Sequence, residues 1–264
     1  ELVFLGNNRI VLVCPNVTSG LSIPEYVHYE NIVTNFMETK KWLSLMNASY
    51  VSLMNELVSS SKIKNFIASN EILFVEDILK ACDTITASKD IKIVLIAGPS
   101  SSGKTTTMKR LSSFLQSRGL HPIGLSTDDF FVDREDTPKN EKGEYDYECL
   151  EAIDLKLFND TLQGLLDGKE VEIPEYDFVA GKKVFKGRKC VLDEKSILIV
   201  EGLHCLNDDL TPYIDERYKY KIYLSPFIPL NIDRHNYIST LDLRLIRRIV
   251  RDNRTRGKNV NQTI

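Results

Sequence analysis

The spacing of apolar residues divides the chain into two parts that meet at the polar joint Ala87–Asp90. In the first part it predicts two short strands and two helices, over residues 2–5, 9–14, 32–37 and 72–85. The trio Gly6-Asn7-Asn8 suits a hairpin turn between the strands, and Ser69 or Asn70 suits the start of the second helix. We therefore expect residues 1–88 to form a small α+β segment.

Beyond the joint, strand-like and helix-like stretches alternate. The run from Ile91 to Ala97 is almost continuously apolar and β-branched, which is typical of a strand buried on both faces. Further strands are predicted over residues 122–126, 196–200 and 218–224, and helices over 105–117, 155–166 and 231–252. Asp154 is placed to cap the second of these helices. The alternation predicts an α/β domain over residues 91–264, with a mostly parallel sheet covered by helices on both faces.

The composition is that of an ordinary globular protein. Of 264 residues, 42% are hydrophobic and 27% are charged, and no apolar run approaches the ~18 residues of a membrane span. The net charge of -3 gives no broad attraction to nucleic acid or to a membrane, so phosphate binding must come from local clusters. Five scattered cysteines without metal-ligand spacing suit reduced thiols and a cytoplasmic location. The abrupt end after a basic segment leads us to expect a C-terminal truncation.

A phosphate-binding motif, Gly98-Pro99-Ser100-Ser101-Ser102-Gly103-Lys104-Thr105, lies between the buried strand and an amphipathic helix. Its glycines let backbone N–H groups wrap around phosphate oxygens at a helix N-terminus. Lys104 is predicted to hold the β- and γ-phosphates, and Thr105 to bind Mg²⁺. The alternative is a plain Ser/Gly-rich connection, which the flanking strand and helix disfavour. The candidate nucleotide-binding residues are Gly98, Ser100, Ser101, Ser102, Gly103, Lys104, Thr105 and Thr106.

Two predicted strands end in acidic residues, where open α/β sheets bind their ligands. Asp128 and Asp129 follow one strand, and Glu201 follows another. We interpret Asp128 as a base that accepts the proton of an acceptor hydroxyl and as a contact to the metal, and Glu201 as part of the Mg²⁺ shell. The alternatives are a helix cap at Asp128 or Asp129 and a merely charged strand exit at Glu201.

Arg244, Arg248 and Arg251 form one stripe of the last predicted helix, and Lys258 continues the charge beyond it. Such a segment suits a lid that closes on a triphosphate and neutralises the charge that develops during transfer. The alternative is a solvated helix face, which would be favoured without the phosphate-binding motif upstream.

A further basic stretch, Lys182–Lys189, follows the segment Pro174–Phe178 and is read as a solvated hairpin tip. For Tyr176 and Phe178, packing on the sheet and stacking on a planar ligand are equally open.

Together these motifs resemble the uridine kinase and phosphoribulokinase family from Ile91 to the C-terminus. In chain order they are the phosphate-binding motif and the stretches 125–131, 145–147, 174–178, 199–202, 242–248 and 256–258. The resemblance implies a P-loop NTPase fold, with ATP and Mg²⁺ as cofactors. It also implies transfer of the γ-phosphoryl group to a hydroxyl of a small metabolite, with the 5′-hydroxyl of a nucleoside as the leading acceptor.

The resemblance also implies residue roles. Asp128 would be the catalytic base, and Thr105, Asp128 and Glu201 would serve Mg²⁺. Asp146 would bind ribose hydroxyls, and Tyr176 and Phe178 would line the base pocket. Lys104, Arg248 and Arg251 would act in catalysis. Arg248, Arg251 and Lys258 would be lid residues, with Lys258 binding the nucleotide.

The chain departs from the family pattern at two points. Nucleoside-specific members carry a histidine where this sequence has Gly181, and the usual His-Pro after the ribose-binding aspartate is replaced by Tyr147-Glu148. Another polyol or vitamin-like alcohol therefore remains open as the acceptor. So does a nucleotide-gated RNA-binding or regulatory module, although we expect no nucleic acid on the kinase domain itself. A homo-oligomer is compatible with the sequence.

Residues 1–88 resemble the tail of the threonyl-tRNA-synthetase-like segment that precedes the kinase in longer bacterial relatives.

Overall fold

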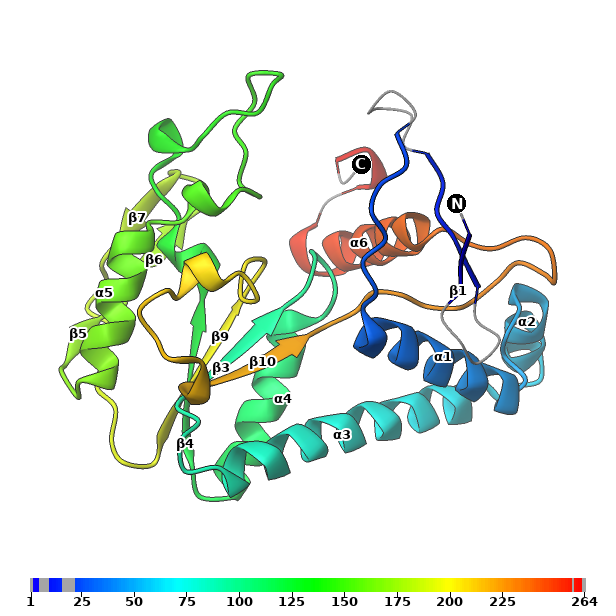
Figure 1. Cartoon of the computed structure of the whole chain (residues 1–264), viewed down its shortest axis with the longest axis horizontal. Coiled ribbons are helices and arrows are strands. Elements are labelled where there is room, and N and C mark those ends of the chain that lie inside the picture. The colour runs from blue at the N-terminus through cyan, green and yellow to red at the C-terminus, as the bar shows by residue number, and fades with distance from the viewer. Residues whose placement is uncertain (1, 5–9, 16–21, 258, 263–264) are drawn as a thin grey trace.

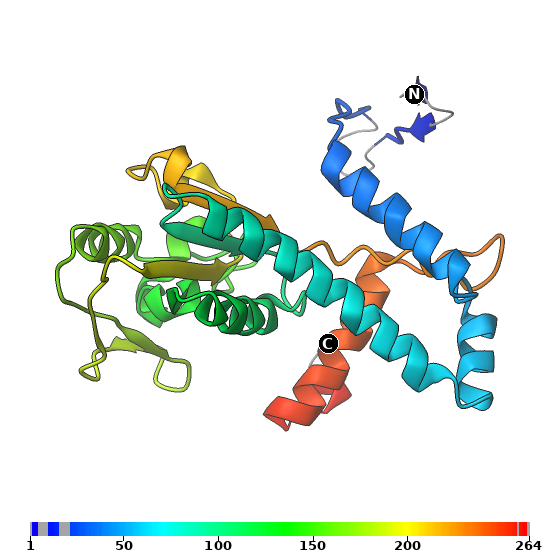
Figure 2. The same cartoon turned by 90° about the horizontal axis from the view of Figure 1, so that it is seen from below.

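The computed structural model describes residues 2–4, 10–15, 22–257 and 259–262 (Figure 1). A sheet with its covering helices forms one side of the molecule in this view, and the N-terminal helices form the other. Figure 2 shows the long helix α3 (Ile63–Ala87) running from the sheet to the N-terminal helices.

The main sheet has four parallel strands in the order β10-β3-β9-β4, which confirms the predicted α/β fold. They are β3 (Ile93–Ala97), β4 (His121–Ser126), β9 (Ser196–Gly202) and β10 (Lys219–Tyr223). Strand β9 runs two residues further than its apolar pattern indicates. Glu201 therefore lies within the sheet, opposite Ile96 and Ser126, and not after the strand as predicted.

Helices cover both faces of the sheet. Helix α4 (Lys104–Ser117) and the C-terminal half of α3 pack on one face, and α5 (Leu155–Leu166) packs on the other. The first core contains Ile78, Cys82, Ile85, Val94, Ile96, Leu111, Leu115, Ile197 and Ile199. The second core includes Ile93, Leu95, Phe158, Leu162, Leu165, Leu198 and Val200. Successive strand residues thus point to opposite faces of the sheet. Each large apolar side chain that is fully buried in these cores contributes about 1.5–3 kcal/mol to the free energy of unfolding.

Helix α5 begins as its sequence predicts. The Asp154 carboxylate accepts a hydrogen bond of 2.9 Å from the Leu157 backbone N–H, which satisfies one of the unpaired donors of the first turn. Ile153 and Phe158 on either side of this cap are both buried.

Two small hairpins follow α5 in the sequence. Strand β6 (Glu175–Asp177) pairs antiparallel with β7 (Lys182–Val184), and β5 (Val171–Glu172) pairs with β8 (Lys189–Cys190). The basic stretch therefore does begin in a hairpin. Short 3-10 helices are η2 (Thr127–Phe130), η3 (Arg134–Asp136), η4 (Leu150–Ala152), η5 (Asp208–Leu210), η6 (Glu216–Tyr218) and η7 (Val260–Gln262).

The N-terminal part contains the predicted hairpin, in which β1 (Leu2–Phe4) pairs antiparallel with β2 (Ile10–Leu12). The expected turn Gly6-Asn7-Asn8 lies outside the described residues. Helices α1 (Glu30–Leu45) and α2 (Val51–Ser59) follow. They share with α3 a small core formed by Leu43, Ala48 and Phe66.

Two predicted helix starts are wrong. Helix α3 already begins at Ile63, so Asn70 lies inside it, where its amide donates to the Phe66 carbonyl and accepts from the Trp42 indole. Helix α6 (Thr240–Arg256) begins nine residues later than the predicted Asn231, with Ser239 as its cap. The preceding stretch forms a turn because the Asp233 carboxylate captures nearby backbone N–H groups. Among all the described helices, none combines the length and the apolar character that crossing a membrane requires.

Candidate functional site

The loop between β3 and α4 is curled by two residues with positive φ, Ser101 at 64° and Gly103 at 102°. The Ser102 N–H donates to the Pro99 carbonyl at 3.1 Å and closes the turn. Gly98 has no room for a side chain, because an added Cβ would lie 2.6 Å from the Ser102 hydroxyl oxygen. The small residues of the motif therefore give the loop its shape.

The loop holds polar groups that suit a bound phosphate. The hydroxyl oxygens of Ser101 and Ser102 are buried and have no hydrogen-bond partner among the described residues. The Lys104 ammonium donates to the Gly98 carbonyl at 2.9 Å, so it folds back across the loop. Buried polar groups without partners are costly unless a ligand binds them. A phosphate at the N-terminus of α4 is such a ligand, and the loop fits one.

A short hydrogen bond joins the loop to β9. The Thr105 hydroxyl donates to Glu201 at 2.6 Å, and Glu201 is only 8% exposed. Burial raises the pKa of Glu201, and the charges of Asp128 and Asp129 raise it further, while Thr105 and Lys104 oppose the rise. A cation at this position would stabilise the carboxylate.

The hydroxyl and carboxylate are ligand types that Mg²⁺ uses, commonly one or two carboxylates together with substrate phosphates. Among the described residues, no three His, Cys, Asp or Glu side chains gather closely enough to hold a metal ion. The hydroxyl of Thr105 and the carboxylate of Glu201 therefore fit an ion that is shared with a nucleotide.

The neighbouring acids at the end of β4 have different surroundings. Asp128 is exposed on η2, whereas Asp129 is half-buried. Burial raises the pKa of Asp129, against the opposing Arg188 guanidinium and a hydrogen bond from the Tyr176 backbone N–H. The side chain of Ser126 caps this turn by accepting from the Asp128 N–H, so neither aspartate is the cap. Asp128 is the acid that an outside molecule can reach.

Aromatic rings gather next to these acids. Phe131 lies edge-on to Tyr176 at 5.6 Å and to Tyr147 at 5.7 Å, and Tyr176 contacts Phe178 at 5.1 Å between ring centroids. Tyr176 is 5% exposed and belongs to the core, whereas Phe178 is 61% exposed. The two readings left open by the sequence therefore separate: Tyr176 packs on the sheet side, and Phe178 is open to a planar ligand. Phe131 and Tyr147 were not among the predicted site residues, although Phe131 belongs to the acidic-aromatic motif.

Asp146 lies in the segment that supplies Tyr147. Its carboxylate accepts a hydrogen bond of 2.9 Å from the Glu148 backbone N–H, which holds the local turn. Its predicted contact with ribose hydroxyls stays a prediction.

The space beside Gly181 is filled by an arginine that the sequence did not single out. Gly181 has a φ of 68°, and an added Cβ would lie 2.7 Å from the Arg134 guanidinium. Arg134 also donates to the Phe178 carbonyl at 2.7 Å. Lys183, also in this hairpin, pairs with Asp154. Gly181 is therefore required by the close approach of Arg134.

The arginines of α6 divide into two groups. Arg248 and Arg251 lie 3.9 and 2.7 Å from the buried carboxylate of Asp252. Arg247 instead donates to the Ser101 carbonyl of the phosphate loop at 3.3 Å. Arg244 lines a cavity of about 480 Å³ beside Gly98 and Pro99, and its Nε is buried without a partner among the described residues. Lys258 lies outside the described residues.

The structure thus brings together Lys104, Thr105 and Glu201, with Asp128 and Asp129 close enough to act on Glu201 electrostatically. Arg247 also reaches the loop, although the sequence gave it no role. The sequence prediction relied on helical spacing and therefore chose the stripe that contains Arg248 and Arg251, and not Arg247. The lid role of these arginines stays a prediction.

Comparison with known proteins agrees with this geometry. The model of the phosphoribulokinase/uridine kinase family matches residues 93–264. The chain belongs to this family. It is accordingly a P-loop kinase with a nucleotide-binding site. The synthetase-like character of residues 1–88, and a domain boundary behind them, stay predictions.

Curated relatives from this family include two uridine kinases. That of Ligilactobacillus salivarius is 31% identical over 172 residues, which are 65% of this chain and 71% of the relative. That of Halobacterium salinarum is 28% identical over 165 residues, 62% of this chain and 63% of the relative. A structure described as a possible uridine kinase from Bacillus stearothermophilus covers 56% of this chain and 79% of its own, at 24% identity and a TM-score of 0.47.

Proposed function

We propose that this kinase transfers the γ-phosphoryl group of Mg²⁺-bound ATP to the 5′-hydroxyl of a nucleoside. The observation that carries the proposal is the 2.6 Å hydrogen bond between Thr105 and the buried Glu201, with Asp128 exposed at the next strand end. This arrangement supports the proposal, because a hydroxyl and a carboxylate of the kind that binds Mg²⁺ lie beside the phosphate loop, and an exposed carboxylate that can serve as the base follows the next strand.

The donor half of the reaction rests on the loop and its neighbours. Backbone N–H groups at the start of α4 bind the phosphates, and Lys104 exchanges the Gly98 carbonyl for phosphate oxygens. When bound, Mg²⁺ would supply positive charge that offsets the charge of the phosphates. Thr105 and Glu201 would hold this ion, and Arg247, which donates to the Ser101 carbonyl, neutralises the charge that develops during transfer.

The acceptor half rests on Asp128 and the aromatic rings. The acceptor oxygen forms a bond to the γ-phosphorus as the bond to the leaving ADP oxygen breaks, and the hydroxyl proton passes to Asp128. The exposed Phe178 ring stacks on the base, and Asp146 binds the ribose hydroxyls. Most of the rate enhancement then comes from positioning and charge neutralisation.

The names of the relatives support a nucleoside as the acceptor, since both curated proteins described above are uridine kinases. The exposed aromatic ring of Phe178 supports a planar ligand in the same region. Gly181 supplies no side chain for reading a pyrimidine, so the proposal specifies a nucleoside and not uridine.

Acceptor-dependent ADP release tests the proposal. The protein would be incubated with Mg²⁺ and ATP alone, with each common nucleoside, and with a set of polyols, and the products would be identified by phosphorus NMR. We expect ADP only with nucleosides, together with a nucleoside 5′-monophosphate. ADP formed only with polyols would replace the nucleoside by another alcohol, and no acceptor-dependent ADP would contradict kinase chemistry at this site.

A further inference from the structure

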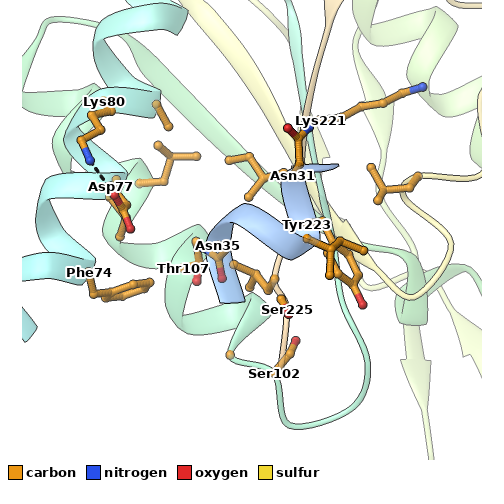
Figure 3. A pocket seen from close by; sticks show the side chains of 18 of the residues that line it. Asn31, Asn35, Phe74, Asp77, Lys80, Ser102, Thr107, Lys221, Tyr223 and Ser225 are labelled. Atoms are coloured by element: carbon orange, nitrogen blue, oxygen red, sulfur yellow. Dashed lines mark hydrogen bonds and ion pairs between the residues drawn. The ribbon is translucent and has the colours of Figure 1, made fainter. Parts of the chain in front are cut away.

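A cleft of about 1300 Å³ opens beside the phosphate loop, between α1, α3, α4 and the end of β10 (Figure 3). Ser102, Gly103 and Thr106 of the loop and of α4 line one side. Asn31 and Asn35 of α1 line another. The cleft thus joins the phosphate-binding residues to a helix that lies outside the family match at residues 93–264.

The order of the strands places this cleft away from the acceptor residues. In the order β10-β3-β9-β4, the phosphate loop follows β3, and the acids follow or end β9 and β4 on one side of it. The cleft is lined by residues 220–225 of β10 and its exit on the other side. A nucleotide whose phosphates lie in the loop, with its γ-phosphate directed at Asp128, therefore extends its nucleoside toward the β10 side.

Most charged side chains that line the cleft are already paired. The pairs are His28 with Glu30, Arg110 with Glu71, Lys80 with Asp77, and Lys221 with Asp208 and Glu216, at 2.6–2.9 Å. A strongly charged ligand would have to compete with these partly exposed pairs for its partners. A neutral heteroaromatic ring would not.

Neutral polar groups remain to meet such a ring. The side-chain amides of Asn31 and Asn35 are exposed, and no hydrogen bond from them is found to any described residue. Tyr223 and Ser225, at the exit of β10, face the same cleft (Figure 3). An asparagine amide presents one donor and one acceptor, which match the N7 acceptor and the N6 donor of adenine. Guanine offers two acceptors at the corresponding positions and matches less well.

We propose that the base and ribose of the donor nucleotide bind in this cleft, and that Asn31 and Asn35 of α1 recognise the adenine. The N-terminal segment is then part of the donor site, with Tyr223 packing against the ring. This inference rests on the proposed function for the identity of the ligand, because it takes the donor to be an adenine nucleotide.

The test compares ligands with and without a nucleoside. ADP, GDP and inorganic tripolyphosphate would be titrated into the full chain and into the double variant Asn31→Ala/Asn35→Ala, by calorimetry with Mg²⁺ present. We expect ADP to bind about ten- to thirtyfold more weakly in the variant, the worth of one or two neutral hydrogen bonds, and tripolyphosphate to bind within about twofold of the original affinity. The preference for ADP over GDP should shrink as well.

Asn65→Ala on α3 is a matched control, because Asn65 is an exposed helical asparagine that does not line the cleft. Its ADP affinity should not change. Unchanged ADP affinity in the double variant would overturn the inference, and so would an equal loss for ADP and tripolyphosphate, because the amides would then act on the phosphate loop.

Photolabelling with 2-azido-ADP is an independent test, which needs no variant, of whether α1 lies next to the adenine ring. We expect the label on the peptide that carries α1, and labelling confined to peptides without α1 would overturn the inference. Neither experiment requires an acceptor. If ADP binding depends on α1 but no alcohol accepts a phosphoryl group, the proposed function fails and the inference stands. If transfer to an alcohol occurs but ADP binding does not depend on α1, the proposed function stands and the inference fails.

Discussion

The two sides of strand β3 differ in the chemistry they offer to a ligand. On the β9 and β4 side lie three acids, Asp128, Asp129 and Glu201, next to a group of packed aromatic rings. On the β10 side lies a cleft whose charges are mostly paired and whose free groups include the amides of Asn31 and Asn35. The acidic side thus holds the buried Glu201 and the half-buried Asp129, whereas most charged side chains that line the β10 side are partly exposed and paired.

This contrast separates chemistry from recognition. Burial raises the pKa values of both Glu201 and Asp129, so these carboxylates are held in an unfavourable setting that a cation relieves. Carboxylates whose charged form is disfavoured by burial are suited to binding a metal ion or accepting a proton. The β10 side, with its paired charges and the neutral amides of Asn31 and Asn35, is suited to binding and selecting a ligand. Substitutions on each side should therefore change different measured quantities.

The largest effect is expected where the two sides meet, at Lys104. In Lys104→Ala the triphosphate loses about two charge-assisted hydrogen bonds of 1.5–3 kcal/mol each, so the affinity for Mg²⁺-ADP should fall by about a hundredfold or more. Calorimetric titration measures this, with the thermal unfolding midpoint as a check on the fold. Lys109→Ala, at an exposed position of the same helix, is the control and should bind normally. Normal affinity in a folded Lys104→Ala protein would remove the phosphate-loop reading.

On the acidic side, Asp128→Asn keeps the shape of the side chain but removes the proton acceptor. Turnover should fall by about 10² to 10⁴, the usual worth of general base catalysis, whereas ADP affinity should change far less. Single-turnover rates with saturating ATP measure this. Asp129→Asn is the natural comparison, because the two acids are neighbours with different exposure. A larger loss in Asp129→Asn than in Asp128→Asn would assign the base to Asp129.

Glu201→Gln removes the buried charge next to Thr105. The tightening of ADP binding by Mg²⁺ should weaken by about ten- to a hundredfold, as is usual when a metal site loses a supporting group. Titrations with and without Mg²⁺ measure this, and an unchanged Mg²⁺ effect would exclude Glu201 from the metal site.

Glu201 also predicts a pH dependence. Because the folded state raises its pKa above the ordinary value of 4.5, the folded state binds the proton more tightly than the unfolded state. Its contribution to the free energy of unfolding is then fully present below pH 4.5 and is lost as the pH rises through the raised pKa. Denaturant unfolding without nucleotide should show a smaller loss in Glu201→Gln than in the wild-type protein, because Asp129, whose pKa is also raised, contributes to the loss in both. A matching loss in the variant would assign the effect to another group.

The smallest effect concerns the choice of acceptor base. Gly181 offers no side chain to a pyrimidine, so uridine and cytidine should not be favoured over purine nucleosides by more than about tenfold, the scale of one hydrogen bond. Deoxynucleosides should suffer more, through the lost contact with Asp146. Values of kcat/KM across a nucleoside panel test both statements. A hundredfold preference for uridine would contradict the prediction and would direct attention to Arg134, whose guanidinium lies beside Gly181.

The features that the sequence predicted correctly are local ones. The phosphate loop needs only small residues and a lysine at fixed spacing, and the Asp154 cap acts on the backbone three residues away. The strands of the sheet were found within one or two residues. For β3 and β9 this is because a strand that is buried on both faces is apolar on both faces.

The features that it missed depend on contacts between distant segments. Helix α2 was not predicted, and none of its residues is fully buried. Arg247 was overlooked because its contact with Ser101 bridges 146 positions of the sequence. Asn31 and Asn35 carried no signal at all, since the helical period of α1 does not say which surface the helix will face. From the sequence, Gly181 was interpreted only as the lack of a histidine side chain, whereas the structure shows that the Arg134 side chain occupies the space beside it.

Helix α3 has a practical consequence for anyone who wishes to separate the two parts of this molecule. It is 25 residues long, about 37 Å, and its last turns place Ile78, Cys82 and Ile85 against the sheet. A kinase trimmed to begin at the joint after Ala87 would leave the facing strand residues, such as Ile96 and Ile199, uncovered. Bare apolar surface of this kind promotes aggregation. Any swap or removal of the N-terminal segment should therefore retain about the last three turns of α3, which serve the sheet and not the helices in front of it.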